Sequence, residues 1–116
     1  MFNDIATTYN IVNTFMTFGL DRIWRRALIR CLPTSCDALL DVASGTMDVA
    51  ICVTKQRPDI GRIVAMDMAE NMLNIGVKRC ERGQINTIES CVGDAHHIPF
   101  NDHEFDAVTV SFGIQL

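Results

Sequence analysis

Short apolar runs alternate along the chain with segments whose apolar residues recur at helical spacing. The runs predict buried β-strands, and the segments between them predict α-helices that stop at a proline or a glycine. Because successive strand, helix and strand normally make a parallel pair with a right-handed crossover, the pattern predicts an α/β domain with a parallel sheet. The predicted strands are residues 37–42, 62–67, 87–92 and 105–112, and the predicted helices are residues 47–56 and 69–82.

Residues 1–36 precede the alternating pattern and predict a helical arm in front of the α/β domain at residues 37–116. Asp21 can cap a helix in this arm, and Pro33 would end it. Arginines occupy one side of the helix. The apolar side, which we expect to be buried, holds Trp24, Ala27, Leu28 and Cys31.

Composition indicates a domain with one core. At 116 residues and 48% hydrophobic, the chain can bury one modest core, and its net charge of −4 argues against a nucleic-acid partner. No apolar run approaches the ~18 residues of a membrane span and no secretory signal is present, so we expect a cytoplasmic protein. The cysteines are odd in number and show no metal-ligand spacing, which predicts reduced, buried thiols. They are Cys31, Cys36, Cys52, Cys80 and Cys91.

The strongest local signal is the turn that follows the first predicted strand. Residues 43–46 are small and let a ligand approach the backbone, while the helix that follows offers unpaired N–H groups. Asp67, at the tip of the second strand, can accept two ribose hydroxyls. The set predicts a nucleoside site. The alternative is a plain strand–helix turn, with Asp67 as a solvated acid or a helix cap.

Motifs in the arm and at the strand ends form a set that spans essentially the whole chain. They lie at residues 1–6, 9, 18–21, 24–26, 40–46, 67–73, 93–95, 98–100 and 105–114. Together they resemble the quinone-biosynthesis C-methyltransferases, the S-adenosylmethionine-dependent enzymes of menaquinone and ubiquinone synthesis. Many methyltransferases share the strand–turn motif, whereas the arm and the Ser-Phe-Gly-Ile segment at residues 111–114 are more specific to this family.

The resemblance implies a Rossmann-like, class I methyltransferase fold, α/β in class, that is truncated after its fourth parallel strand and carries an N-terminal helical arm. It also implies a transferase that uses S-adenosyl-L-methionine to methylate the ring of a demethylated, prenylated quinol. Only the N-terminal half of the family pattern is present. We therefore expect an incomplete acceptor pocket and an isolated chain that is inactive.

The resemblance assigns cofactor contacts to the first two strand ends. The methionine part of the cofactor would lie against the backbone of Ala43, Gly45 and Thr46. Ribose hydroxyls would bond to Asp67, and Met68 follows it as a further cofactor-binding position. The resemblance leaves the catalytic residues unknown and implies no metal.

Further cofactor contacts are assigned to the later strands and to the arm. Asp94 and Ala95 would read the adenine edge, and Ser111 would contact the cofactor from the end of the fourth strand. Asp4 and Tyr9 lie in the arm that folds over the cofactor in the family. From the residues alone, the alternatives are a loop aspartate that makes a local turn and a strand serine bonded to backbone.

One position departs from the family pattern. The family's turn reads Gly-Thr-Gly-Asp, whereas this chain has Gly45-Thr46-Met47-Asp48. If the third position requires a positive φ, a side chain there costs about 1 kcal/mol or more. If that position is helical, methionine is acceptable. The sequence leaves both cases open.

Two groups of polar residues have both a functional and a plain interpretation. Because a histidine side chain ordinarily titrates near neutrality, His96 or His97 could supply a general base, but adjacent loop residues point apart, which favours surface or packing histidines. Arginines of the arm could touch membrane headgroups beside a substrate with a lipid tail, although a solvated helix face is favoured. These arginines are Arg22, Arg25, Arg26 and Arg30.

Two other function classes stay open. A nicotinamide dehydrogenase would also use a strand–turn–helix and a strand-end acid, but the G-x-G-x-x-G pattern is absent because Gly45 is the single glycine of the turn. The second class is a non-catalytic remnant or partner-binding module. If the fourth strand lacks a neighbour on one side, its apolar edge invites pairing with a second copy.

Overall fold

The computed structural model describes residues 10–13, 26, 29–94, 97–101 and 103–110. Its strands form one five-stranded sheet in the order β1-β5-β2-β3-β4, and every neighbouring pair is parallel. The strands are β1 (Asn10–Asn13), β2 (Ala38–Val42), β3 (Arg62–Asp67), β4 (Ile88–Val92) and β5 (Ala107–Val110). The helices are α3 (Asp48–Gln56) and α4 (Glu70–Arg82).

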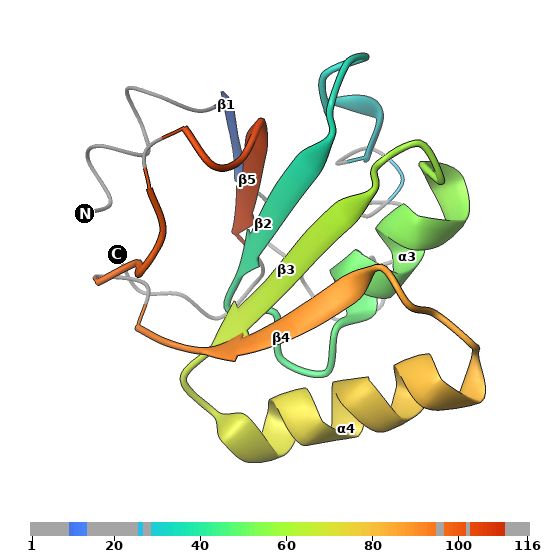
Figure 1. Ribbon diagram of the computed structural model, residues 1–116, viewed down its shortest axis with the longest axis vertical. Helices are drawn as coiled ribbons and strands as arrows, with labels where there is room; N and C mark the ends of the chain where they lie inside the picture. The colour runs from blue at the N-terminus through green and yellow to red at the C-terminus, as the bar shows by residue number, and fades with distance from the viewer. Residues whose placement is uncertain (1–9, 14–25, 27–28, 95–96, 102, 111–116) are drawn as a thin grey trace.

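The four predicted strands and both predicted helices are confirmed, with bounds that differ by one residue at most except in β5. That strand begins at Ala107, because Asp106 uses its carboxylate and its backbone N–H to bond the start of β2. Both helices connect neighbouring parallel strands, and Figure 1 shows them on one side of the sheet. This is the α/β arrangement that the alternation predicts.

The expectation that the fourth predicted strand lacks a neighbour on one side is wrong. β1 pairs with β5 in parallel, with Asn10 opposite Ala107 and Asn13 opposite Val110. The outer row of β5 backbone groups is therefore bonded, as buried N–H and C=O groups require. The N-terminal region thus contributes a strand to the sheet as well as helical residues. The division at residue 36 and self-association of the chain stay predictions.

The sheet has a hydrophobic core on each face, because side chains alternate along each strand. Leu39 and Ile63 are fully buried against α3 and α4. Leu40 and Val64 face the opposite side, where Phe105 covers them. Burial on both faces explains why the strands read as continuous apolar runs rather than as alternating ones.

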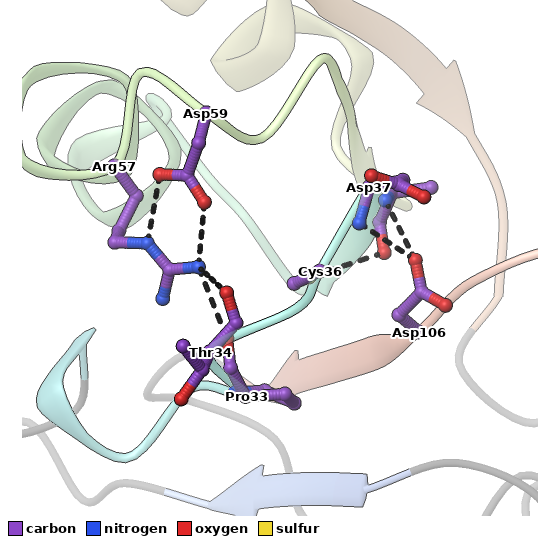
Figure 2. Close-up of polar contacts among 8 residues, drawn as sticks. Pro33, Thr34, Cys36, Asp37, Arg57, Asp59 and Asp106 are labelled. Carbon is purple, nitrogen blue, oxygen red and sulfur yellow. Dashed lines mark hydrogen bonds and ion pairs between the residues drawn. The ribbon is translucent and has the colours of Figure 1, made fainter.

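The end of the arm is anchored to the loop that follows α3. The Arg57 guanidinium donates to both carboxylate oxygens of Asp59, at 2.9 and 2.8 Å, and to the carbonyl oxygens of Pro33 and Thr34, at 3.0 and 3.2 Å (Figure 2). Nε has one N–H and Nη2 has two, so three N–H groups serve the four acceptors, and one N–H of Nη2 is shared between two of them. Two carbonyl groups of residues 33–34 are thereby tied to the α/β domain.

A second anchor lies where β2 begins. The Asp106 carboxylate accepts the backbone N–H groups of Asp37 and Ala38, at 2.8 and 3.0 Å (Figure 2). Beside it, the buried Cys36 thiol donates to the Ala38 carbonyl at 3.6 Å. Burial, together with the nearby Asp106 carboxylate, raises the pKa of Cys36 to about 11. The thiol is therefore protonated at neutral pH.

The predicted apolar face of the arm helix is partly wrong. Cys31 is exposed, whereas Ile29, which was not predicted to be buried, is 3% exposed and joins the core. Leu32 and Cys36 bury beside it after the helical residues end, so the chain turns its apolar side chains inward there. The other predicted members, Trp24, Ala27 and Leu28, lie outside the described residues. Within the described part of the chain, no helix has the length and apolarity needed to cross a membrane.

Candidate functional site

The turn after β2 is built from left-handed backbone. Ala43, Gly45 and Met47 have φ of 58°, 59° and 69°. The Ser44 N–H donates to the Met66 carbonyl at 2.9 Å, and the Met47 N–H donates to the Ser44 carbonyl at 3.0 Å. The chain therefore reverses tightly at the carboxyl end of β2 before α3 begins at Asp48.

Asp67 holds this turn from the neighbouring strand. Its Oδ2 accepts the Gly45 N–H at 2.8 Å, and its Oδ1 accepts the Ala69 N–H at 2.8 Å. The carboxylate thus ties the turn after β2 to the start of α4. Each carboxylate oxygen can accept a second hydrogen bond, so Asp67 can hold the turn and still accept ligand hydroxyls. Asp67 is not itself the N-cap of α4, since that residue is Ala69, but the bond to the Ala69 N–H is compatible with the ligand interpretation.

Exposed apolar side chains flank Asp67 at the same edge of the sheet. Met68 is 69% exposed and Val92 is 55% exposed, and the register of β3 and β4 sets Val92 opposite Asp67. Large apolar side chains at the carboxyl ends of parallel strands suit contact with a flat apolar group. The edge therefore offers polar acceptors next to an apolar surface.

Asp94 and His97 meet in a tight turn just beyond β4. The His97 N–H donates to the Asp94 carbonyl at 2.9 Å, and His97 Nδ1 lies 3.8 Å from Asp94 Oδ2. The sequence offered no carboxylate partner for this histidine, since the pairing depends on the turn. His97 is exposed, in keeping with the surface interpretation. Asp94 makes a local turn here, and that leaves its carboxylate half-exposed at the carboxyl edge.

Two buried polar residues of this region were missed by sequence reasoning. The Ser44 hydroxyl is buried and has no hydrogen-bond partner among the residues that the structure describes. Asp41 is fully buried on β2 and accepts the Thr109 hydroxyl at 2.6 Å. A serine in a small-residue turn and an acid inside an apolar strand were the available signals. Buried polar groups of this kind concentrate at functional sites.

The structure settles the question about Met47. Its φ of 69° and ψ of 31° are left-handed. The position is therefore the one with positive φ, where a side chain is strained, and not a helical one. The side chain is 1% exposed and packs beneath α4, away from solvent. The turn therefore keeps the left-handed conformation that a glycine would adopt most easily, and the methionine side chain adds to the core.

Several predicted site residues lie outside the described part of the chain. They are Asp4, Tyr9, Ala95, His96 and Ser111. The structure brings Gly45 and Asp67 into direct contact and sets Met68 beside them. Ala43 and Thr46 belong to the same turn. These residues of the predicted cofactor site therefore lie together on one edge of the sheet, where β2 and β3 end.

Three thiols of the described region, those of Cys36, Cys80 and Cys91, are poorly suited to act as nucleophiles. Burial raises the pKa of Cys80 and Cys91 as well as that of Cys36, and a raised pKa disfavours the reactive thiolate. Among the described residues, no cluster of three or more histidine, cysteine or acidic side chains is placed to hold a metal ion. The edge of the sheet at Asp67 therefore offers a ligand hydrogen-bond acceptors, a left-handed backbone turn and exposed apolar side chains.

The parallel order β5-β2-β3-β4, with a tight turn after β2 and an acid at the tip of β3, is that of the Rossmann-like class I methyltransferase fold, and solved structures of that class match it. A protein from Bacillus halodurans proposed to be a methyltransferase matches with a TM-score of 0.65 and 29% identity, over 79% of this chain and 38% of its own. A protein from Methanococcus maripaludis proposed to be an S-adenosyl-L-methionine-dependent methyltransferase matches with a TM-score of 0.67 and 26% identity, over 74% of this chain and 39% of its own.

Within this class, the chain belongs to the ubiE/COQ5 methyltransferase family, whose model matches residues 1–116. It is 38% identical to a demethylmenaquinone methyltransferase of Porphyromonas gingivalis, over 99% of this chain and 48% of that protein. It is 40% identical to a ubiquinone/menaquinone biosynthesis C-methyltransferase of Geobacter sulfurreducens, over 99% of this chain and 46% of that protein. The chain spans about half the length of these relatives.

Proposed function

We propose that this chain binds S-adenosylmethionine and forms the donor-binding part of a C-methyltransferase that acts on the ring of a demethylated quinol. The observation that carries the proposal is the contact between the Gly45 N–H and the Asp67 carboxylate at 2.8 Å, which joins the turn and the strand-end acid into one site. The names of the P. gingivalis and G. sulfurreducens relatives support the substrate class.

The residues present fit this cofactor. The left-handed turn at Ala43 and Gly45 exposes backbone to a polar amino-acid group, and the buried Ser44 hydroxyl has bonding capacity to spare. The Asp67 oxygens can each accept a ribose hydroxyl, and Met68 flanks the position for a flat base. S-adenosylmethionine, when bound, supplies a methyl group on a sulfonium.

The chain's own residues bind and orient the donor rather than react with it. Asp67 positions the ribose while it holds the Gly45 turn, so one carboxylate fixes both the site and the ligand. Asp94, half-exposed beyond β4, would accept a hydrogen bond from the adenine amino group. Rigid orientation of this kind is what brings a donor into line with an acceptor carbon.

The acceptor and the setting of the reaction belong to the same proposal. A prenylated quinol fits the family, and its lipid tail makes peripheral contact with a membrane surface useful to the protein. Arg26 and Arg30 of the arm are exposed and could meet anionic headgroups there. Salt-sensitive binding to anionic vesicles, lost in an Arg26→Gln, Arg30→Gln variant, would support this part of the proposal.

Replacing Asp67 tests the cofactor site. We expect Asp67→Ala to weaken S-adenosylmethionine binding by about 1.5–3 kcal/mol, the scale of a lost charged hydrogen-bond acceptor, as measured by isothermal titration calorimetry. Glu70→Ala is the matched control, since it removes an exposed carboxylate from the first turn of α4 without touching the turn after β2. Equal affinity in the Asp67 variant and the wild type would remove Asp67 from the site. Preferential binding of a nicotinamide dinucleotide would favour the dehydrogenase alternative.

Replacing Ser44 should affect the stability of the protein and its affinity for S-adenosylmethionine in opposite directions. We expect Ser44→Ala to leave the free energy of unfolding unchanged or to raise it by about 1 kcal/mol, because a buried hydroxyl without a partner is removed. The same change should weaken S-adenosylmethionine binding by about 0.5–1.5 kcal/mol if the hydroxyl bonds the ligand. Urea unfolding and calorimetry measure the two effects. Stability that falls while affinity holds would assign Ser44 to the fold alone.

A further inference from the structure

One face of α4 contacts the turn after β2 at three positions. Gly76, Arg79 and Cys80 are spaced three and four residues apart, so they share a side of the helix. Arg79 Nη1 donates to the Thr46 carbonyl at 2.8 Å, and Cys80 Sγ lies 3.9 Å from Met47 Sδ. α4 therefore contacts the turn at Thr46 and Met47, while Asp67, at the end of β3, bonds the turn at Gly45.

Arg79 joins the two residues on either side of Met47. The same Nη1 that bonds the Thr46 carbonyl lies 2.5 Å from Asp48 Oδ1, in the first turn of α3. Met47, left-handed at φ 69°, is thus fixed between two residues that one guanidinium holds. A non-glycine residue keeps a left-handed conformation only where its surroundings over-determine it. By bonding Thr46 and Asp48, Arg79 helps to keep Met47 in this conformation.

The ion pair itself contributes little to global stability. The side chains of Arg79 and Asp48 are 37% and 56% exposed, and pairs this exposed are screened by solvent. The bond to the Thr46 carbonyl has a local effect, because it fixes a backbone group inside the turn that also presents Gly45 to Asp67. Loss of Arg79 should therefore loosen the turn more than it lowers the stability of the domain.

Gly76 allows α4 to come this close. A Cβ placed on Gly76 would lie 2.5 Å from Met47 Cγ and 3.1 Å from the Thr46 carbonyl oxygen. The absence of a side chain at Gly76 leaves the space that the Met47 side chain fills. The arginine reaches the turn because the helix axis is held near it.

We propose that Arg79 is a positioning residue for the cofactor-binding turn: it holds Thr46 and Asp48 so that the Gly45 N–H stays on Asp67 and S-adenosylmethionine meets a preformed site. The inference rests on the proposed function for its ligand. The positioning of the turn is a property of the ligand-free chain and can be measured separately.

The experiment compares Arg79→Met, Arg79→Lys and Lys78→Met with the wild type in the 116-residue chain. Lys78→Met is the matched control, because it removes the same charge from the adjacent exposed position of α4, where the structure describes no contact with residues 44–48. Amide hydrogen exchange of residues 44–48, resolved by NMR without ligand, reports the turn. Urea unfolding reports global stability, and calorimetry reports S-adenosylmethionine affinity.

We expect Arg79→Met to speed exchange at Gly45 and Met47 and to lower affinity, each by about tenfold, with a much smaller change in the core strands. Arg79→Lys should restore part of both effects, and Lys78→Met should match the wild type. Unchanged exchange at these two amides, or equal acceleration throughout the domain, would overturn the inference. Faster exchange with unaltered affinity would overturn its functional half. A wild-type chain that binds no S-adenosylmethionine would refute the proposed function, and the ligand-free exchange would still decide whether Arg79 holds the turn.

Discussion

The purified 116-residue chain is expected to transfer no methyl group from S-adenosylmethionine to a demethylated quinol. In the proposed function, the turn after β2 and Asp67, which are bonded to each other, bind the methyl donor. A groove of about 660 Å³ is lined by the C-terminal half of α4, the loop that follows it, the start of β4 and Met47. Neither Gly45 nor Asp67 lines this groove, so it does not provide an acceptor pocket beside the donor. Poor alignment of donor and acceptor can remove ~7–11 kcal/mol of rate advantage, which makes turnover undetectable.

The assay needs a labelled methyl donor, a demethylated quinol and a relative as the positive control. The G. sulfurreducens C-methyltransferase, of which this chain covers 46%, is suitable because it is 40% identical over the shared part. Turnover by the chain above a no-protein blank, abolished by Asp67→Ala, would contradict the prediction. It would mean that this chain, alone or as two copies, completes the acceptor pocket.

The second large effect concerns Met47, which is strained and buried at once. Met47→Gly should relieve about 1–2 kcal/mol of left-handed strain but lose about 2–5 kcal/mol of packing beneath α4, so the protein becomes less stable. Met47→Ala keeps the strain and loses the packing, and should be the least stable of the three. Urea unfolding gives the order. A Met47→Gly variant more stable than the wild type would show that the side chain contributes less than the strain costs.

Gly76 should be coupled to Met47. Gly76→Ala places a Cβ 2.5 Å from Met47 Cγ and should destabilise the fold by about 1–3 kcal/mol through overpacking. In the double variant with Met47→Gly the new methyl enters vacated space, so the combined loss should be smaller than the sum by about 1 kcal/mol or more. Gly61→Ala is the matched control, because a Cβ there meets nothing within 4 Å. Additive losses would show that the two positions do not share that space.

The strands and helices of residues 37–110 were predictable because each carries its own periodicity. β3 matches its prediction at both ends, since an apolar run between Gly61 and an aspartate has few alternative conformations. The segment at Asn10–Asn13 has no such pattern, and its strand conformation comes from the unpaired edge of β5. Cys31 was predicted to be buried from its helical spacing and as one of the reduced thiols, but it is exposed, and the end of the arm turns Ile29 and Leu32 inward instead.

The candidate site was predictable as a set of residue types and only partly as an arrangement. Gly45 and Asp67 were expected to serve one ligand from neighbouring strand ends, and the structure brings them within hydrogen-bond distance. The second bond of Asp67, to Ala69, and the approach of His97 to Asp94 depend on loop geometry that residue spacing does not encode. Ser44 was overlooked because a serine in a turn is normally solvated or bonded to backbone.

By itself the sequence determined the α/β class, the order of its strands and helices along the chain, and the family. These properties follow from local patterns of burial and from motifs read one segment at a time. Only the tertiary structure decided that Met47 is left-handed, that Gly76 makes room for its side chain and that Arg79 bonds the Thr46 carbonyl. Each of these depends on residues about thirty positions apart that meet only when α4 packs on the sheet, and such contacts are set by the folded core rather than by any local preference.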